Sequence, residues 1–153
     1  MVVQLVQEEL FLWLLNNMNI GNLTKQAQSE QLPLPYIDVF DRDISLGNGT
    51  QAITGIGFKP TCILFFSAIG NSDYASWGFD TLTQESGIQH FGDTDSFASF
   101  AGGGNSIQFS DSVSGFVITA TITSMDSDGF TLTWTVVSGS PIGTARMTFV
   151  AFK

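Results

Sequence analysis

The chain of 153 residues has very few of the residues on which most enzymes and metal sites depend. It contains one cysteine, Cys62, which allows neither an internal disulfide nor a cysteine-based zinc site. Its one histidine, His90, argues against a histidine-rich metal centre or a histidine-relay enzyme. We therefore expect a binding or structural protein without enzymatic activity, cofactor or metal ion.

Basic residues are scarce as well. Five Lys and Arg stand against 14 Asp and Glu, which gives a formal net charge of −9. Proteins that bind nucleic acids need a basic surface to neutralise phosphates, and anionic membranes attract basic segments. The charge balance therefore argues against both nucleic acid and membrane as partners.

Long hydrophobic runs are also missing near the start of the chain. The longest there, residues 10–15, has six residues, whereas a membrane-spanning helix needs about 20. Glu8 and Glu9 precede this run, so the positive segment that begins a secretory signal is not evident. We expect a soluble protein made in a cytoplasm.

Glycine divides the chain into two parts. Residues 1–45 hold Gly21 alone, and residues 46–153 hold the other glycines. In the first part, apolar residues at spacings of three and four predict a helix over residues 3–18. We expect residues 1–45 to form a helical and extended docking arm, anchored by Leu10, Trp13 and Leu14. The partner of this apolar face is left open between the domain's own core, a sister subunit and a larger assembly.

Residues 46–153 are typical of an antiparallel β-sandwich or jelly roll. The segments 116–124 and 130–137 alternate apolar residues with threonine and are joined by a turn that ends at Gly129, which predicts a hairpin. The continuous apolar run 62–68 predicts a strand buried on both faces. Further strands are expected over residues 74–80, 87–91, 96–101, 105–110 and the closing residues 145–153. The threonine rows would face solvent or a neighbouring subunit.

Several polar residues are candidates for chemistry. His90 could act with a serine and an aspartate, but no GxSxG motif accompanies it, and an ordinary surface histidine is the simpler interpretation. Alternate carboxylates can bind calcium or serve glycoside hydrolysis. The pairs are Asp41/Asp43, Asp93/Asp95 and Asp126/Asp128. None extends into an EF-hand loop, so we interpret them as turn residues.

Aromatic residues gather in the segment 72–80, among polar residues and glycine. Tyr74, Trp77 and Phe79 could stack on sugar rings if they are exposed. They could equally be buried in the core or at a subunit interface. The sequence leaves both interpretations open.

Three segments together resemble a known group of proteins. They are ITGIGFKPTCILFFSA (residues 53–68), SMDSDGFTLTWT (residues 124–135) and the closing MTFVAFK. Over residues 47–153 this pattern is similar to phage and prophage virion structural proteins of capsid-decoration or tail-fibre type. The resemblance implies a β-sandwich structural module, and it implies no catalytic residues. It does not cover the first 45 residues.

The expected function follows from the resemblance and the composition. We expect a capsid decoration (cement) protein in the virion, forming a homo-oligomer, with a trimer favoured, on the assembled shell. Its partner would be the major capsid protein or another virion protein. The alternative is a tail-fibre or baseplate module that binds host-surface glycan through Tyr74 and Trp77. A small hydrolase that uses carboxylates or His90 is the third hypothesis.

Overall fold

The computed structural model describes residues 34–70, 72–91, 96–101 and 104–153. Within these ranges the chain forms ten strands and one short 3-10 helix, η1. The elements are β1 (Tyr36–Asp43), η1 (Ile44–Leu46), β2 (Gly49–Thr54), β3 (Cys62–Ile69), β4 (Ala75–Asp80), β5 (Glu85–Phe91), β6 (Ser96–Ala101), β7 (Ile107–Ser110), β8 (Val117–Asp126), β9 (Gly129–Ser138) and β10 (Thr144–Phe152). The predicted mostly-β fold is confirmed, and the helix predicted over residues 3–18 lies outside the described residues.

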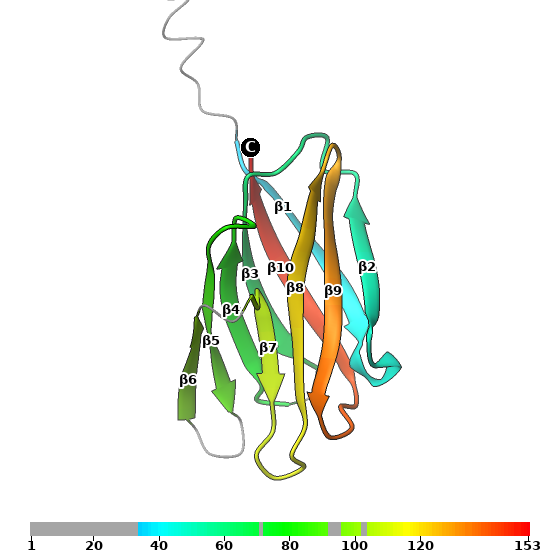
Figure 1. Cartoon of the computed structure of the whole chain (residues 1–153), viewed down its shortest axis with the longest axis vertical. Coiled ribbons are helices and arrows are strands. Elements are labelled where there is room, and N and C mark those ends of the chain that lie inside the picture. Colours follow the sequence, from blue (N-terminus) through cyan, green and yellow to red (C-terminus); the bar gives the residue numbers. More distant parts are fainter. Residues whose placement is uncertain (1–33, 71, 92–95, 102–103) are drawn as a thin grey trace, which may run out of the picture. The chain divides into compact units, whose positions relative to one another are not determined.

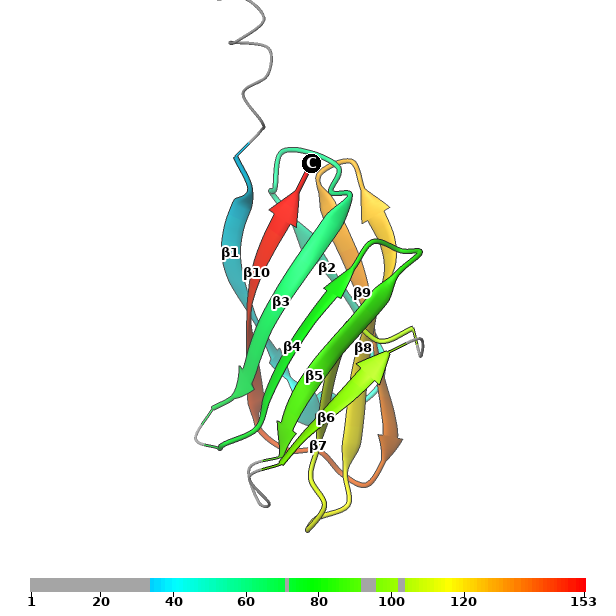
Figure 2. The same cartoon turned by 90° about the vertical axis from the view of Figure 1, so that its left-hand side faces the viewer.

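The strands form two antiparallel sheets packed as a sandwich (Figures 1 and 2). The larger sheet has the order β1-β10-β3-β4-β5-β6, and the smaller has the order β2-β9-β8-β7. The predicted hairpin is β8–β9, with Asp126 paired to Gly129 across the turn. Gly129 is required there because a Cβ atom would lie 1.8 Å from the carbonyl oxygen of Ile53 on the neighbouring β2.

The β domain begins earlier than the sequence predicted. Residues 36–43 were expected to belong to the arm, but they form β1, which pairs along its whole length with β10 from Tyr36–Ala151 to Asp43–Thr144. Contacts within the chain separate a unit Met1–Pro33 from a unit Leu34–Lys153. The boundary at residue 45 is therefore replaced by one near residue 33, because the extended segment after Pro35 completes the larger sheet.

One half of the interior is aromatic. Here β1, β10 and β3 face β9, and the ring of Phe130 lies 5.3 to 6.3 Å from the rings of Phe40, Phe65 and Phe149. Phe65, Phe130 and Phe149 are fully buried. We call this region the aromatic half. On β9 the buried residues Phe130, Leu132 and Trp134 occupy the alternate positions that the sequence pattern predicted.

The other half of the interior combines apolar side chains, such as Ile107 and Phe109 on β7, with a group of buried polar ones. Where β4 and β5 face β7 and the segment before it, the buried side chains include Ser76, Asp80, Gln89, Ser106 and Ser110. They bond across the two sheets: Ser106 Oγ donates to Asp80 Oδ2 at 2.5 Å, and Ser110 Oγ donates to Gln89 Oε1 at 3.1 Å. Buried polar groups are tolerated when each finds such a partner. We call this region the polar half.

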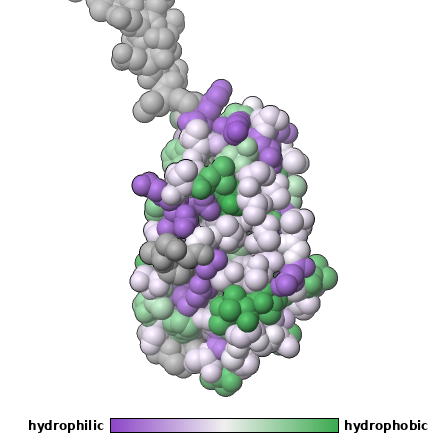
Figure 3. All heavy atoms as spheres, viewed as in Figure 1, coloured by the Kyte–Doolittle hydropathy of each residue, from purple (hydrophilic) through white to green (hydrophobic). Residues whose placement is uncertain are grey.

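The smaller sheet exposes its threonine-rich face. Thr123, Thr131 and Thr133 are linked by hydroxyl hydrogen bonds between β8 and β9. Figure 3 looks onto this sheet, and much of its surface has intermediate hydropathy. One prediction about the larger sheet is wrong, however. Strand β3 is buried on one face only, because none of the described segments covers its other side, and Phe66 is 47% exposed there.

Candidate interaction surface

The outward face of the larger sheet carries a broad band of apolar side chains. Strand register aligns them in rows across the sheet. The central row runs Val39, Thr148, Phe66, Trp77, Ile88 and Ser99 from β1 to β6. The row beside it runs Ile37, Val150, Leu64, Phe79 and Ser86 from β1 to β5. We call these rows, together with Phe97 on β6, the outer apolar face.

Several side chains of this face are strongly exposed. Ile37, Val39, Ile88 and Phe97 have between 45% and 64% of their surface accessible. Single exposed apolar residues are common on proteins, but a contiguous set on one flat sheet face marks an interaction site. Figure 2 shows these strands lying side by side across the front of the domain.

Aromatic contacts connect β4, β5 and β6 across this face. The rings of Trp77 and Phe97 have centroids 6.3 Å apart, and Phe97 also lies 4.7 Å from the His90 ring. Two shallow hollows flank Trp77. One, of about 500 Å³, lies between it and Arg146, and the other, of about 260 Å³, lies against Leu64, Phe79 and Ser86. The face therefore offers both protruding rings and recesses, the relief that interdigitating partners need.

Charge is nearly absent from the outer apolar face. On the described outward positions of β3, β4, β5 and β6 there is no Asp, Glu, Lys or Arg. At the β1–β10 corner, Arg146 donates to both carboxylate oxygens of Asp41 at 2.8 Å. This hydrogen bond is the main cause that lowers the pKa of Asp41 below its ordinary value. In a chain of net charge −9, the described outward positions of β3 to β6 are thus both uncharged and largely apolar.

The aromatic residues predicted for sugar stacking are separated by the fold. Trp77 and Phe79 point outward from β4 into the outer apolar face. Tyr74 precedes β4 and points inward, where its ring packs against Phe116 at 6.0 Å. Tyr74 and Trp77 therefore lie on opposite sides of the larger sheet. The predicted anchors Leu10, Trp13 and Leu14 lie outside the described residues.

The catalytic candidates are not brought together by the fold. His90 faces outward on β5, and its Nδ1 donates to the carbonyl oxygen of Asp73 at 2.7 Å. Asp43 caps η1 by accepting from the N–H of Ser45 at 3.0 Å. Asp128 accepts from the N–H groups of Gly55 and Gly57 at 3.1 and 2.6 Å. Within the described part of the chain these carboxylates serve turns and caps, as the turn interpretation predicted.

The remaining candidates give no site of their own. Asp126 accepts from Ser124 and Thr131 hydroxyls, while Asp93 and Asp95 lie outside the described residues. Burial is the main cause that raises the pKa of the Cys62 thiol, which disfavours the reactive thiolate. Among the residues that the structure describes, no group of three or more His, Cys, Asp or Glu is placed to hold a metal ion. The described segments also contain no helix of the length and hydropathy that crossing a membrane requires.

Comparison of the chain with protein-family models, with curated proteins and with solved structures finds no match. A sequence signal for the outer apolar face exists: the apolar run of β3 has more large side chains than one buried face needs. Its partners on β4 and β5 could not be identified without knowing which strands are neighbours.

Proposed function

We propose that this chain is a non-enzymatic structural protein of a phage virion, a capsid decoration protein that assembles as a homo-oligomer on the shell and stabilises it. The observation that supports this best is the outer apolar face, a flat, uncharged surface rich in aromatic residues. Interfaces between proteins are depleted of charge and enriched in aromatic residues at their centre. The resemblance to virion structural proteins supplies the biological setting.

The occupant that we assign to the outer apolar face is another copy of this chain. Each copy carries a net charge of −9, so the repulsion between two copies is lowest where they meet through surfaces without carboxylates. The outward positions of β3 to β6 meet that condition. A partner of unlike charge would instead be expected to meet an acidic surface.

The size of the face also suits self-association. Six strands at about 4.8 Å spacing and two rows of side chains about 6.7 Å apart give a footprint on the order of 400 Å². The accessible area of such a corrugated surface exceeds its footprint and is a substantial part of the roughly 800 Å² that each partner contributes to a standard interface. The homo-oligomer that we propose is a trimer.

Decoration would then act by linkage. A protein that binds only the assembled shell stabilises that shell by mass action, and several linked copies bind more tightly than one. In this proposal the domain Leu34–Lys153 makes the contacts between copies. The residues before Leu34, with the predicted anchors Leu10, Trp13 and Leu14, reach the major capsid protein.

The copy number of this chain in purified particles tests the proposed location. Quantitative mass spectrometry against the major capsid protein should give one copy per capsid subunit or a simple fraction of it. A few to a few dozen copies per particle would instead indicate a tail-fibre or baseplate part, and Trp77→Ala would then be tested for weaker glycan binding. Absence of the chain from the particle would overturn both virion assignments.

Sedimentation of the purified full chain tests the proposed contact. We expect an oligomer at micromolar concentration that Ile88→Asp, in the central row of the outer apolar face, converts into a folded monomer. Val137→Asp is the matched control, since Val137 is also an exposed β-branched strand residue, 63% accessible, but lies on β9 of the smaller sheet. A wild-type monomer at 100 μM, about a hundredfold above this range, or an oligomer that survives Ile88→Asp, would contradict the assignment.

A further inference from the structure

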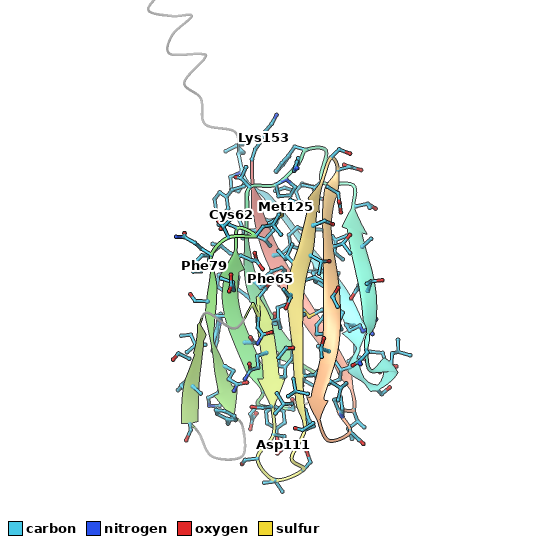
Figure 4. The ribbon with its side chains drawn as sticks, viewed as in Figure 1. Cys62, Phe65, Phe79, Asp111, Met125 and Lys153 are labelled. Atoms are coloured by element: carbon cyan, nitrogen blue, oxygen red, sulfur yellow. The ribbon has the colours of Figure 1, made fainter. Side chains whose placement is uncertain are left out.

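A pocket lies at one end of the sandwich, next to the outer apolar face, and Gly70 lines both this pocket and the hollow beside Arg146. Three connections meet there: β3–β4, β7–β8 and β9–β10. Its volume is about 380 Å³, inside the range of roughly 300 to 1,000 Å³ typical of small-molecule sites. Figure 4 shows Asp111 at this end and Met125 toward the opposite end.

The walls of this loop-end pocket are mostly apolar. Tyr74 and Phe116 pack edge to face, with ring centroids 6.0 Å apart, and Ile69 closes the inner side. Ile142 stands at the pocket with 74% of its surface exposed. Gly143 also lines the pocket, and because it has no side chain it takes up little of the pocket volume. An apolar group of several carbons would therefore be covered on more than one side.

The polar atoms that reach the pocket are mainly acceptors, because their hydrogens are already used. Ser114 Oγ donates to Asp111 Oδ2 at 2.5 Å, and Ser72 Oγ donates to the carbonyl oxygen of Ile69 at 2.9 Å. The Tyr74 hydroxyl also bonds to the Asp111 carboxylate. What remains for a ligand is hydroxyl lone pairs and the negative charge of Asp111, whose oxygens already accept hydrogen bonds from Ser114, Val113 and Tyr74. Such a lining selects a molecule that brings its own donors.

The charge at the pocket is negative. The hydrogen bond from Ser114 is the main cause that lowers the pKa of Asp111, and N–H groups of Val113 and Ser114 add to it. The carboxylate is therefore ionised at neutral pH. The partners recorded for it are N–H and O–H groups of its own turn and of Tyr74, not a Lys or Arg side chain. A cation placed here would meet a negative charge that these hydrogen bonds do not neutralise, and opposite charges at short distance attract.

We propose that the loop-end pocket binds an organic cation with an apolar body, the chemistry shared by an alkylammonium ion and a lysine side chain. The ammonium group lies against Asp111, and the carbon chain lies along Tyr74, Phe116 and Ile142. This site uses other side chains than the outer apolar face and does not depend on the proposed virion function.

Titrations followed by NMR on the full chain test the site with four probes. We expect n-hexylammonium to bind in the millimolar range, typical of a ligand this small. Methylammonium lacks the long carbon chain, and hexan-1-ol lacks the positive charge. Each should bind at least tenfold more weakly than n-hexylammonium. Hexanoate should not bind. Equal shifts from hexanoate and hexylammonium, or no shifts at the pocket residues, would overturn the proposal.

Two variants locate the effect. Asp111→Asn should lower the affinity for n-hexylammonium at least tenfold and leave that for hexan-1-ol unchanged. Asp126→Asn is the matched control, because Asp126 also accepts hydrogen bonds from two hydroxyls but does not line this pocket. Unchanged hexylammonium affinity in Asp111→Asn, or an equal loss in both variants, would contradict the assignment.

A pH series on the wild-type chain gives an independent measurement if Asp111→Asn fails to fold. Binding should be constant around neutral pH and fall only as the pH drops through the lowered pKa of Asp111. Loss of binding near pH 6 to 7 would contradict a role for this carboxylate. The source of the cation is tested by Nα-acetyl-lysine N-methylamide: binding as tight as hexylammonium indicates a lysine side chain, and weaker binding indicates a free amine.

Discussion

The two halves of the sandwich interior differ in the interactions that join the sheets. In the aromatic half, the fully buried rings of Phe65, Phe130 and Phe149 meet at 5.3 to 5.8 Å, and stability comes from area removed from water. In the polar half, side chains such as Asp80 and Ser106 join the sheets by hydrogen bonds with fixed directions. Apolar packing is tolerant of direction, whereas the polar half specifies how β4 and β5 sit against β7.

The largest effect is expected from breaking the aromatic half. Phe130→Ala removes the ring that contacts Phe40, Phe65 and Phe149 and leaves a cavity between the sheets. We expect a loss of about 3–5 kcal/mol in the free energy of unfolding. Chemical denaturation at a fixed protein concentration measures it, because self-association adds a concentration-dependent contribution. A loss below about 1 kcal/mol would mean that this half is not the principal source of stability.

Close approach of backbones in the polar half gives the next effect. Gly78 on β4 lies so near the segment before β7 that a Cβ atom would stand 2.0 Å from the carbonyl oxygen of Ser106. Gly78→Ala must push the sheets apart, at a cost of about 3 kcal/mol. Gly104→Ala is the control, since its Cβ would meet nothing within 4 Å, although its φ of +75° adds backbone strain. Equal destabilisation by the two variants would show that sheet spacing is not what Gly78 protects.

The hydrogen bonds of the polar half are tested without a change in backbone. Ser106→Ala removes the donor to Asp80 and the acceptor of the Ile122 N–H, both buried. We expect a loss of roughly 2 kcal/mol, since buried polar groups are left without partners. Ser114→Ala is the control, because its bond to Asp111 is exposed. An unchanged free energy of unfolding in Ser106→Ala would mean that these hydrogen bonds do not stabilise the fold.

The smallest effect lies on the surface. The pKa of Asp41 is lowered in the folded chain by Arg146, so the ion pair stabilises the fold above the ordinary pKa near 3.8 and loses this contribution as the pH falls through the lowered value. Arg146→Ala should therefore narrow the stability difference between pH 7 and pH 3 slightly. The wild-type difference should shrink in high salt. An effect as large as that of Phe130→Ala would contradict this ranking.

The sequence predicted the fold better than it predicted the surface. Alternation in β8 and β9 made the hairpin visible, because one face of each strand is buried and the pattern needs no knowledge of distant residues. Strand β1 was missed because its partner, β10, lies about a hundred residues away, and its own pattern is weak. The outer apolar face was missed for the same reason: Phe66, Trp77 and Ile88 form a row only once the strand order is known.

The pairing of β1 with β10 also sets how the domain responds to a pulling force. Tyr36 lies opposite Ala151, so the start of β1 and the C-terminus lie at the same end of the sandwich (Figure 1). The hydrogen bonds of an antiparallel pair run perpendicular to the strands. A load applied between residues 34 and 153 would therefore open this ladder one pair at a time, like a zipper, instead of shearing all the bonds together. Tension between the two chain ends would detach β1 at low force.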